Sequence, residues 1–188
     1  IYADLARRDF TINALAQEVR TGELLDPHGG RADLAARQVQ FVGEAEARIL
    51  EDPLRMLRAV RFCAQLGFAP AEETTEAIER LAGEIARISW ERIRDEYDGI
   101  LLSENAGEGV RLLIGLGLAH YTLPELEAMK LPQDPRYHLK DVLEHTLEAV
   151  ELAPAERVLR WTMLLHDIAK PETFSVDEEG IHFYRHEE

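Results

Sequence analysis

The 188-residue chain is acidic, with 36 Asp and Glu against 21 Lys and Arg, and 46% of its residues are hydrophobic. That hydrophobic content is enough for a buried core, so collagen-like, disulfide-scaffold and wholly disordered classes are excluded. A net charge of −15 argues against non-specific binding of nucleic acid over the whole surface. Because residues 1–70 are nearly neutral, the acidic excess lies after residue 70, and nucleic acid would need a local basic strip.

The single cysteine and the absence of long apolar runs indicate a compartment. Cys63 has no second cysteine in the chain to pair with, which is typical of a reducing environment. No apolar run approaches the roughly 20 residues needed to span a bilayer, and the N-terminus lacks a signal-peptide core. We therefore expect a soluble, cytoplasmic protein. The chain opens on Ile1 within a dense motif and stops at Glu188, so we expect a fragment at both ends.

The first 44 residues are expected to be mixed α/β. The segment ARRDFTINALA predicts a helical turn that enters a short apolar element, and GELLDPHGG predicts a hairpin or a strand closed by the Asp-Pro and Gly-Gly pairs. The next segments, DLAARQ and VQFVG, predict a short helix and a short strand, and Gly43 marks a boundary.

After residue 45 strand signals nearly vanish and the apolar spacing is helical. Leu54, Leu57 and Val60 belong to an apolar face that predicts one amphipathic helix over residues 51–66, with Gly67 as its C-cap. The same criteria predict helices over residues 74–86, 89–102, 110–118, 139–152 and 156–169. The proline-rich stretch 123–138 predicts an irregular connection. The chain is therefore expected to be mainly α.

The start of the 51–66 helix carries charged residues at a constant spacing of three. Asp52, Arg55, Arg58 and Arg61 would form a slowly rotating stripe along one side of that helix. One interpretation is a capped surface helix, with an Asp52–Arg55 ion pair and two solvated arginines that contribute little to stability. The other interpretation is a site that recognises a nucleotide.

The second interpretation rests on hydrogen-bonding chemistry. A carboxylate only accepts and a guanidinium only donates, so Asp52 beside Arg55 would present an acceptor and a donor at fixed separation. Cytosine and adenine offer an amine donor next to a ring-nitrogen acceptor, whereas guanine and uracil offer a carbonyl and a ring N–H there. The pair could therefore select C and A without a template, and arginines further along the helix could bind a triphosphate.

Several motifs in order resemble one family. ARRDFTINALA, LLDPHGGRADL, VQFVG, EDPLRMLRAVRF and ISWERIRDE occur in the order seen in class II tRNA nucleotidyltransferases and bacterial poly(A) polymerases, and the CCA-adding enzymes look most similar. The resemblance implies template-independent addition of C, A or both from CTP and ATP to the 3′ end of tRNA. The nucleotide-binding residues it implies are Arg8, Asp52, Arg55, Arg58 and Arg61, with Asp9 and Asn13 as support for the pocket.

The motif that performs transfer in that family is absent from this sequence. The family has a glycine-rich loop and a pair of Mg²⁺-binding carboxylates upstream of the ARRD motif, where two metal ions activate the attacking hydroxyl and the leaving pyrophosphate. Asp4 and Asp9 do not match that pair. We expect this chain alone to be inactive in transfer, with no catalytic residue in it, and the intact protein to be the enzyme.

Six of the seven histidines follow residue 119, and three positions suggest a metal site. His145 lies in one predicted helix, and His166 and Asp167 end the next, so two facing helices could hold a divalent ion. The pattern resembles the HD superfamily of metal-dependent phosphohydrolases, which makes His186 a further candidate ligand. The alternative is that His145 is a hydrogen-bonded core residue and that the His-Asp pair merely ends a helix.

These motifs imply three parts: the end of a mixed α/β nucleotidyltransferase head in residues 1–44, an all-helical neck with the EDxxR element in 45–106, and a helical HD-like domain in 107–188. Two other functions stay open. One is a metal-dependent phosphohydrolase with a vestigial head, and the other is a non-catalytic RNA-binding or assembly module. A Gly-Gly loop and an Asp-x-Asp pair upstream would favour nucleotidyl transfer, and their absence would favour the others.

Overall fold

The computed structural model describes residues 1–134, 136, 139–178 and 180–186. The first part contains α1 (Tyr2–Leu5), the 3₁₀ helix η1 (Thr11–Asn13), β1 (Ala16–Gln17), β2 (Leu24–Leu25), α2 (Gly30–Ala36) and β3 (Gln38–Val39). The centre contains α3 (Ala45–Glu51), α4 (Leu54–Leu66), β4 (Ala69–Pro70), α5 (Glu72–Leu81), the 3₁₀ helix η2 (Ala82–Arg87), α6 (Trp90–Leu101) and α7 (Ala106–Gly115). The last part contains α8 (Leu118–Thr122), α9 (Glu125–Ala128), α10 (Val142–Leu152), α11 (Arg157–Leu165), α12 (Lys170–Thr173), β5 (Phe174–Asp177) and β6 (Gly180–Phe183).

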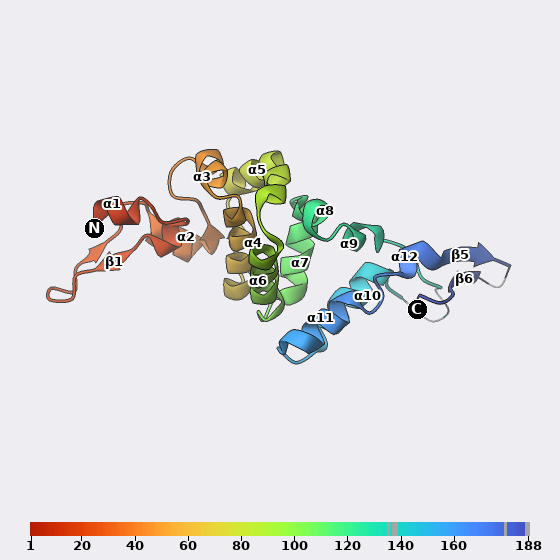
Figure 1. Cartoon of the computed structure of the whole chain (residues 1–188). Coiled ribbons are helices and arrows are strands. Elements are labelled where there is room, and N and C mark those ends of the chain that lie inside the picture. Colours follow the sequence, from red (N-terminus) through yellow and green to blue (C-terminus); the bar gives the residue numbers. More distant parts are fainter. Residues whose placement is uncertain (135, 137–138, 179, 187–188) are drawn as a thin grey trace.

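The molecule is elongated and mainly α, as expected. Figure 1 shows the N-terminal hairpin at one end, the central helices α4, α6 and α7 in the middle, and the β5–β6 hairpin at the other end. Every helix in the described part of the chain is too short or too polar to cross a bilayer. The proposed divisions at residues 44 and 106 remain predictions.

Short strands tie the N-terminal part to the central helices. The segment GELLDPHGG forms a strand, β2, which pairs antiparallel with β1 so that Ala16 lies opposite Leu25. The turn of this hairpin lies between the two strands, before the Asp-Pro and Gly-Gly pairs that were expected to close it. Strand β3 pairs in parallel with β4, which follows α4 in the chain. Phe10 forms a backbone bridge with Phe41, and their rings lie 5.0 Å apart between centroids. These contacts hold the segment around Phe10 against α4, which is the position the candidate site requires.

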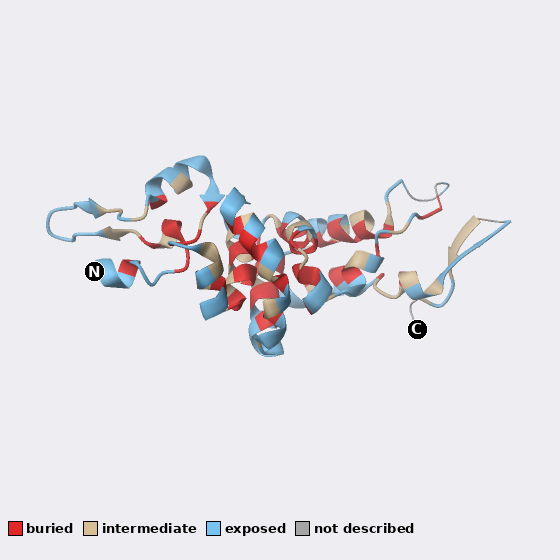
Figure 2. Cartoon of the chain, turned by 90° about the horizontal axis from the view of Figure 1, so that it is seen from above, coloured by how far each residue is buried: buried red, intermediate tan, exposed pale blue. Residues whose placement is uncertain are grey.

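The core lies in the central helices, where Figure 2 shows most of the buried residues. Helix α4 packs against α6 and α7, and one cluster of buried side chains extends from Phe10 to Leu164. Gly109 lets these helices approach closely, because a Cβ atom there would lie 2.5 Å from Ile100 Cγ2 and 2.9 Å from Ala64 Cβ. The space around Gly109 is thus fully used by its neighbours.

This close approach leads to a stability prediction. Gly109→Ala is expected to lower the free energy of unfolding by about 1–3 kcal/mol, because the new methyl group overpacks the contact between three helices. Gly115→Ala, on the same helix, is the control: among the described residues, no atom other than those of its chain neighbours and its own helix backbone lies within 4 Å of the added Cβ. That variant should be neutral or gain up to about 1 kcal/mol from helix propensity. Urea unfolding measures both, and equal effects of the two substitutions would contradict the packing argument.

The predicted helix over residues 51–66 is interrupted near its start. Helix α3 ends at Glu51, Asp52 is extended with φ −151° and ψ 98°, and α4 begins at Leu54. The reason is Pro53, which lacks a backbone N–H and disfavours a helical conformation in the residue before it. At the other end the prediction is confirmed, since Gly67 has φ 64° in the left-handed region.

Four other sequence expectations need correction. The helix expected over residues 74–86 is divided into α5 and η2, and the stretch expected to be irregular contains the short helix α9. The helix expected over residues 110–118 is also divided, because α7 ends at Gly115 and the left-handed Gly117 precedes α8. Strands are also present beyond residue 45: β4 pairs with β3, and β5 and β6 form a four-residue antiparallel hairpin near the end of the chain. The alternation of Phe174, Ser175, Val176 and Asp177 is a period-two pattern, but it is too short to stand out beside helical segments.

Candidate functional site

A polar pocket of about 480 Å³ lies where the segment before η1 meets the first turns of α4 and α6. Its lining residues are Arg7, Arg8, Asp9, Asn13, Asp52, Leu54, Arg55, Arg58 and Arg92. Five arginines against two aspartates give this pocket a positive potential within an acidic protein. The pocket therefore suits a ligand with several negative charges and a polar edge, such as a nucleoside triphosphate.

Asp52 is held by α6 and not by Arg55. Its Oδ2 accepts a hydrogen bond from Arg92 Nη2 at 2.9 Å, and its Oδ1 accepts one from the backbone N–H of Leu54 at 3.2 Å. A carboxylate has about four lone-pair positions, so it can accept a further bond from a ligand amine. The side chain is one-third exposed, which leaves it accessible from the pocket.

Arg55 has separate partners in α3. Its Nη1 donates to Glu51 Oε2 at 2.6 Å and to the carbonyl oxygen of Arg48 at 2.8 Å. The predicted Asp52–Arg55 ion pair is thus wrong, because the break at Pro53 takes Asp52 off the helical stripe. The acceptor and the donor both line the pocket, but different elements fix their positions.

Asp9 and Arg58 connect the N-terminal segment to α4. The guanidinium of Arg58 donates from Nε at 2.7 Å and from Nη2 at 2.5 Å to the same Asp9 oxygen. Asn13 Nδ2 and the backbone N–H of Phe10 donate to the other oxygen. Burial raises the pKa of Asp9, but the hydrogen bonds from Asn13 and Arg58 and the Arg58 charge outweigh it, so the pKa is lowered from 3.8. Asp9 is therefore an anion that orients Arg58.

Arg61 does not line the pocket, in contrast to the expectation that it reaches the phosphates. Its Nε donates to Glu96 Oε2 at 2.6 Å, and its aliphatic stem lies against Gly99 of α6, where a Cβ atom would clash with it. A spacing of three residues per step turns slowly around the helix, so the fourth member of the stripe faces α6. Arg61 fixes the contact between α4 and α6.

Sequence reasoning missed Arg7, Arg92 and Glu96. Arg7 and Arg92 line the pocket, and Glu96 is buried between Arg58 and Arg61. The available signal was the ISWERIRDE segment, which contains both α6 residues, but their partners lie 35–40 positions earlier in the chain. Without the fold, nothing in the spacing shows which carboxylate each arginine meets.

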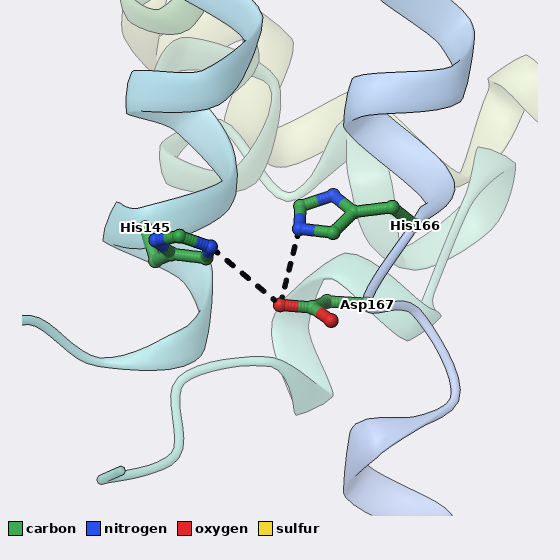
Figure 3. A group of neighbouring side chains, drawn as sticks. All are labelled: His145, His166 and Asp167. Atoms are coloured by element: carbon green, nitrogen blue, oxygen red, sulfur yellow. Dashed lines mark ion pairs between the residues drawn. The ribbon is translucent and has the colours of Figure 1, made fainter. Parts of the chain in front are cut away.

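A second group of side chains lies between α10 and α11 (Figure 3). His145, His166 and Asp167 each offer a ligand atom, and these atoms lie within 4.8 Å of one another. Asp167 Oδ2 is 3.2 Å from His166 Nε2 and 3.9 Å from His145 Nε2. The fourth predicted residue, His186, places its Nε2 at 3.6 Å from Asp167 Oδ1. The structure thus brings all four predicted residues together.

The orientation of two imidazoles fits a metal ligand set. His166 Nδ1 lies 2.8 Å from the carbonyl oxygen of Met163, and His186 Nδ1 lies 2.7 Å from that of Phe183. Since a carbonyl only accepts, each Nδ1 donates a hydrogen bond to it, and each Nε2 faces Asp167. Asp167 is buried, and among the described residues its Oδ2 accepts no hydrogen bond of regular geometry. These donors suit a divalent transition metal.

The chain resembles known protein families over two ranges. Residues 1–40 match the family model "Poly A polymerase head domain", and residues 67–130 match "Probable RNA and SrmB-binding site of polymerase A". The A-adding tRNA nucleotidyltransferase of Deinococcus radiodurans is 43% identical over 188 residues, which cover 94% of this chain and 42% of that protein. The chain belongs to the tRNA nucleotidyltransferase and poly(A) polymerase family.

Other tRNA nucleotidyltransferase relatives agree with this result. The CCA-adding enzyme of Geobacillus sp. is 46% identical over 126 residues, which cover 67% of this chain and 31% of that enzyme. The solved structure of the Bacillus stearothermophilus CCA-adding enzyme in complex with CTP has a TM-score of 0.71 and 35% identity, covering 89% of this chain and 40% of that one. The chain thus spans less than half the length of these relatives.

Proposed function

We propose that this chain is the nucleotide-selecting part of a tRNA nucleotidyltransferase, which adds C, A or both from CTP and ATP to the 3′ end of tRNA. The observation that carries the proposal is the pocket, since it joins the ARRD segment to the EDxxR element and to α6. Parts 40 residues apart converge there on one cationic surface. We also propose the division into head (1–44), neck (45–106) and HD-like domain (107–188).

Six side chains of the pocket have proposed roles. Asp52 accepts a hydrogen bond from the exocyclic amine of cytosine or adenine, and Arg55 donates to the adjacent ring nitrogen. The contacts of Arg55 within the described residues use Nη1, so Nε and Nη2 can donate to a base. Arg8 and Arg58 bind the phosphates, where a planar cation fits well. Asp9 and Asn13 hold the pocket in shape.

Transfer itself needs Mg²⁺ and a pair of carboxylates, which we assign to head residues outside this chain. The test is transfer by the intact protein onto two tRNAs, one that lacks its 3′-terminal CCA and one that ends in CC, with each labelled nucleotide offered singly. We expect incorporation from CTP, from ATP or from both, and none from GTP or UTP. Incorporation of all four nucleotides, or of none, would contradict the proposal. A tRNA substrate and the unpaired Cys63 both suit the cytoplasm.

The second cluster favours an additional role. We propose that His145, His166, Asp167 and His186 hold one divalent transition-metal ion in an HD-like domain. A bound ion would lower the pKa of a coordinated water and so supply a nucleophile for phosphoester hydrolysis. The supporting observation is the orientation of the imidazoles, whose Nδ1 contacts leave Nε2 facing the buried carboxylate. This candidate requires no contribution from the nucleotide pocket.

The metal proposal predicts a measurable loss. After dialysis, the purified chain is expected to retain about one divalent ion, and the His166→Ala, Asp167→Ala double variant is expected to lose it, because imidazole and carboxylate ligands are both removed. His182→Ala is the matched control: His182 pairs with Asp177 at 2.9 Å and stacks on Tyr184, outside the cluster. Mass-spectrometric metal analysis measures the metal content of the wild type, the double variant and His182→Ala. Equal metal content in these three proteins would reject the site.

A further inference from the structure

Lys170 is a buried cation beside the candidate metal cluster. Its side chain is only 9% exposed, and its Nζ lies 2.8 Å from Asp167 Oδ2. The same Nζ donates a hydrogen bond to Gln133 Oε1 at 3.0 Å and lies 5.2 Å from the centre of the Phe183 ring. Burying an ammonium is costly unless it is paired and hydrogen-bonded, so this placement depends on Asp167.

Gln133 joins this pair to the helix that carries His145. Its Nε2 donates to the carbonyl oxygens of Lys140 and Asp141, at 3.2 and 3.3 Å, and Asp141 caps α10 through the backbone N–H of Glu144 at 2.7 Å. The side chain of Gln133 is therefore fixed, with its carbonyl oxygen directed at Lys170. The ammonium therefore has one hydrogen-bond acceptor, Gln133, and one ion-pair partner, Asp167, and separate parts of the chain set their positions.

The carboxylate oxygen that Lys170 contacts is the one that the imidazoles approach. Asp167 Oδ2 lies 3.2 Å from His166 Nε2 and 3.9 Å from His145 Nε2. A metal ion ligated by both imidazoles and by Oδ2 would meet the ammonium at the same oxygen. Two cations that share one carboxylate oxygen repel each other strongly in a buried setting.

We propose that Lys170 is a resident counter-ion that competes with a divalent metal for Asp167 and thereby sets the metal affinity of the cluster. The inference rests on the metal site proposed above. It differs from a supporting role, in which a neighbour orients a ligand and its removal weakens metal binding. Here the removal of the ammonium strengthens binding, because Oδ2 is released and a repulsive charge is lost. Gln133 is the acceptor that keeps the ammonium in the site.

The test measures Mn²⁺ affinity by isothermal titration of the full chain after metal removal. Lys170→Met, which keeps an unbranched apolar stem beside Phe183, is expected to bind Mn²⁺ about ten- to a hundredfold more tightly than the wild type, the range over which neighbours of metal ligands act. Lys170→Gln, which keeps an N–H donor without charge, should change in the same direction. Lys140→Met is the matched control, since Lys140 is exposed and pairs with Glu148 at 2.8 Å.

The melting temperature is a second measurement, which distinguishes the proposed effect from a folding defect. Without its counter-ion, Asp167 is a buried unpaired charge, so Lys170→Met should melt at a lower temperature than the wild type in the absence of metal. Added Mn²⁺ should raise the melting temperature of Lys170→Met more than that of the wild type. If the wild type binds Mn²⁺ and both Lys170 variants bind it equally or less tightly, the counter-ion role is wrong while the metal site stands. If the wild type binds no better than His166→Ala, Asp167→Ala, both proposals fail.

Discussion

Asp52→Ala in the intact protein is expected to abolish the preference for CTP and ATP over GTP and UTP. The base amine loses its acceptor, and one hydrogen bond to a charged group is worth roughly 1.5–3 kcal/mol, or about ten- to a hundredfold in affinity. The substitution also releases Arg92, whose Nη2 is 2.9 Å from Asp52 Oδ2. That guanidinium stays in the pocket, so the cationic surface for the triphosphate persists while the base is no longer read.

Competition assays with the four nucleoside triphosphates measure this effect. Asp95→Ala is the matched control, because Asp95 is an exposed aspartate of α6 that pairs with Arg94 and lies outside the pocket. It removes the same charge and should leave the preference unchanged. If Asp52→Ala weakens all four nucleotides equally and the preference survives, Asp52 is only part of an ion-paired surface element.

Arg58→Ala is expected to weaken binding of all four nucleoside triphosphates alike, by about ten- to a hundredfold, because a phosphate contact carries no information about the base. The same assays measure it, with Arg80→Ala as control. Arg80 is an exposed arginine that pairs with Glu46 away from the pocket. A selective loss of CTP and ATP in Arg58→Ala would place Arg58 at the base instead of the phosphates.

Arg58→Ala is also expected to change the pH at which the protein unfolds in acid. In the wild type the pKa of Asp9 is lowered from 3.8, so its contribution to stability is present above that value and is lost as pH falls through the lowered pKa of the folded state. Without Arg58, Asp9 keeps only Asn13 and the Phe10 backbone as donors, and its pKa rises. Acid unfolding, followed by circular dichroism, should therefore begin at a higher pH in Arg58→Ala. An unchanged acid transition would show that Arg58 does not stabilise the Asp9 anion.

The sequence predicted which residues meet at the pocket better than how they pair. The ARRD and EDxxR segments line one cavity, as their motif order implies, and apolar periodicity correctly located most helices. The prediction of an Asp52–Arg55 ion pair was wrong, because a spacing of three residues implies contact only within a continuous helix and Pro53 interrupts this helix. Arg92 and Glu96 were not predicted, because their contacts with Asp52 and Arg61 arise from the packing of α4 against α6.

The histidine cluster shows the same division. The two helical segments grouped His145, His166 and Asp167, and the resemblance to the HD superfamily added His186, which the structure places beside Asp167. The buried Lys170 could not be foreseen, because its acceptor Gln133 lies in a proline-rich stretch whose conformation no periodicity describes. Burial of a lysine is a property of the surrounding fold and has no local sequence signal.

The break at Pro53 affects how the base preference of the protein can change through substitutions during evolution. On an unbroken helix Asp52 and Arg55 would neutralise each other, and altering one would disturb the other. Here the acceptor is anchored by Arg92 and the donor by Glu51, so each has its own support. Replacing Asp52 should therefore leave the contacts of Arg55 with Glu51 and Arg48 in place, and replacing Arg55 should leave the contact of Asp52 with Arg92 in place. Another side chain can therefore replace the acceptor Asp52 during evolution while the donor Arg55 keeps its position.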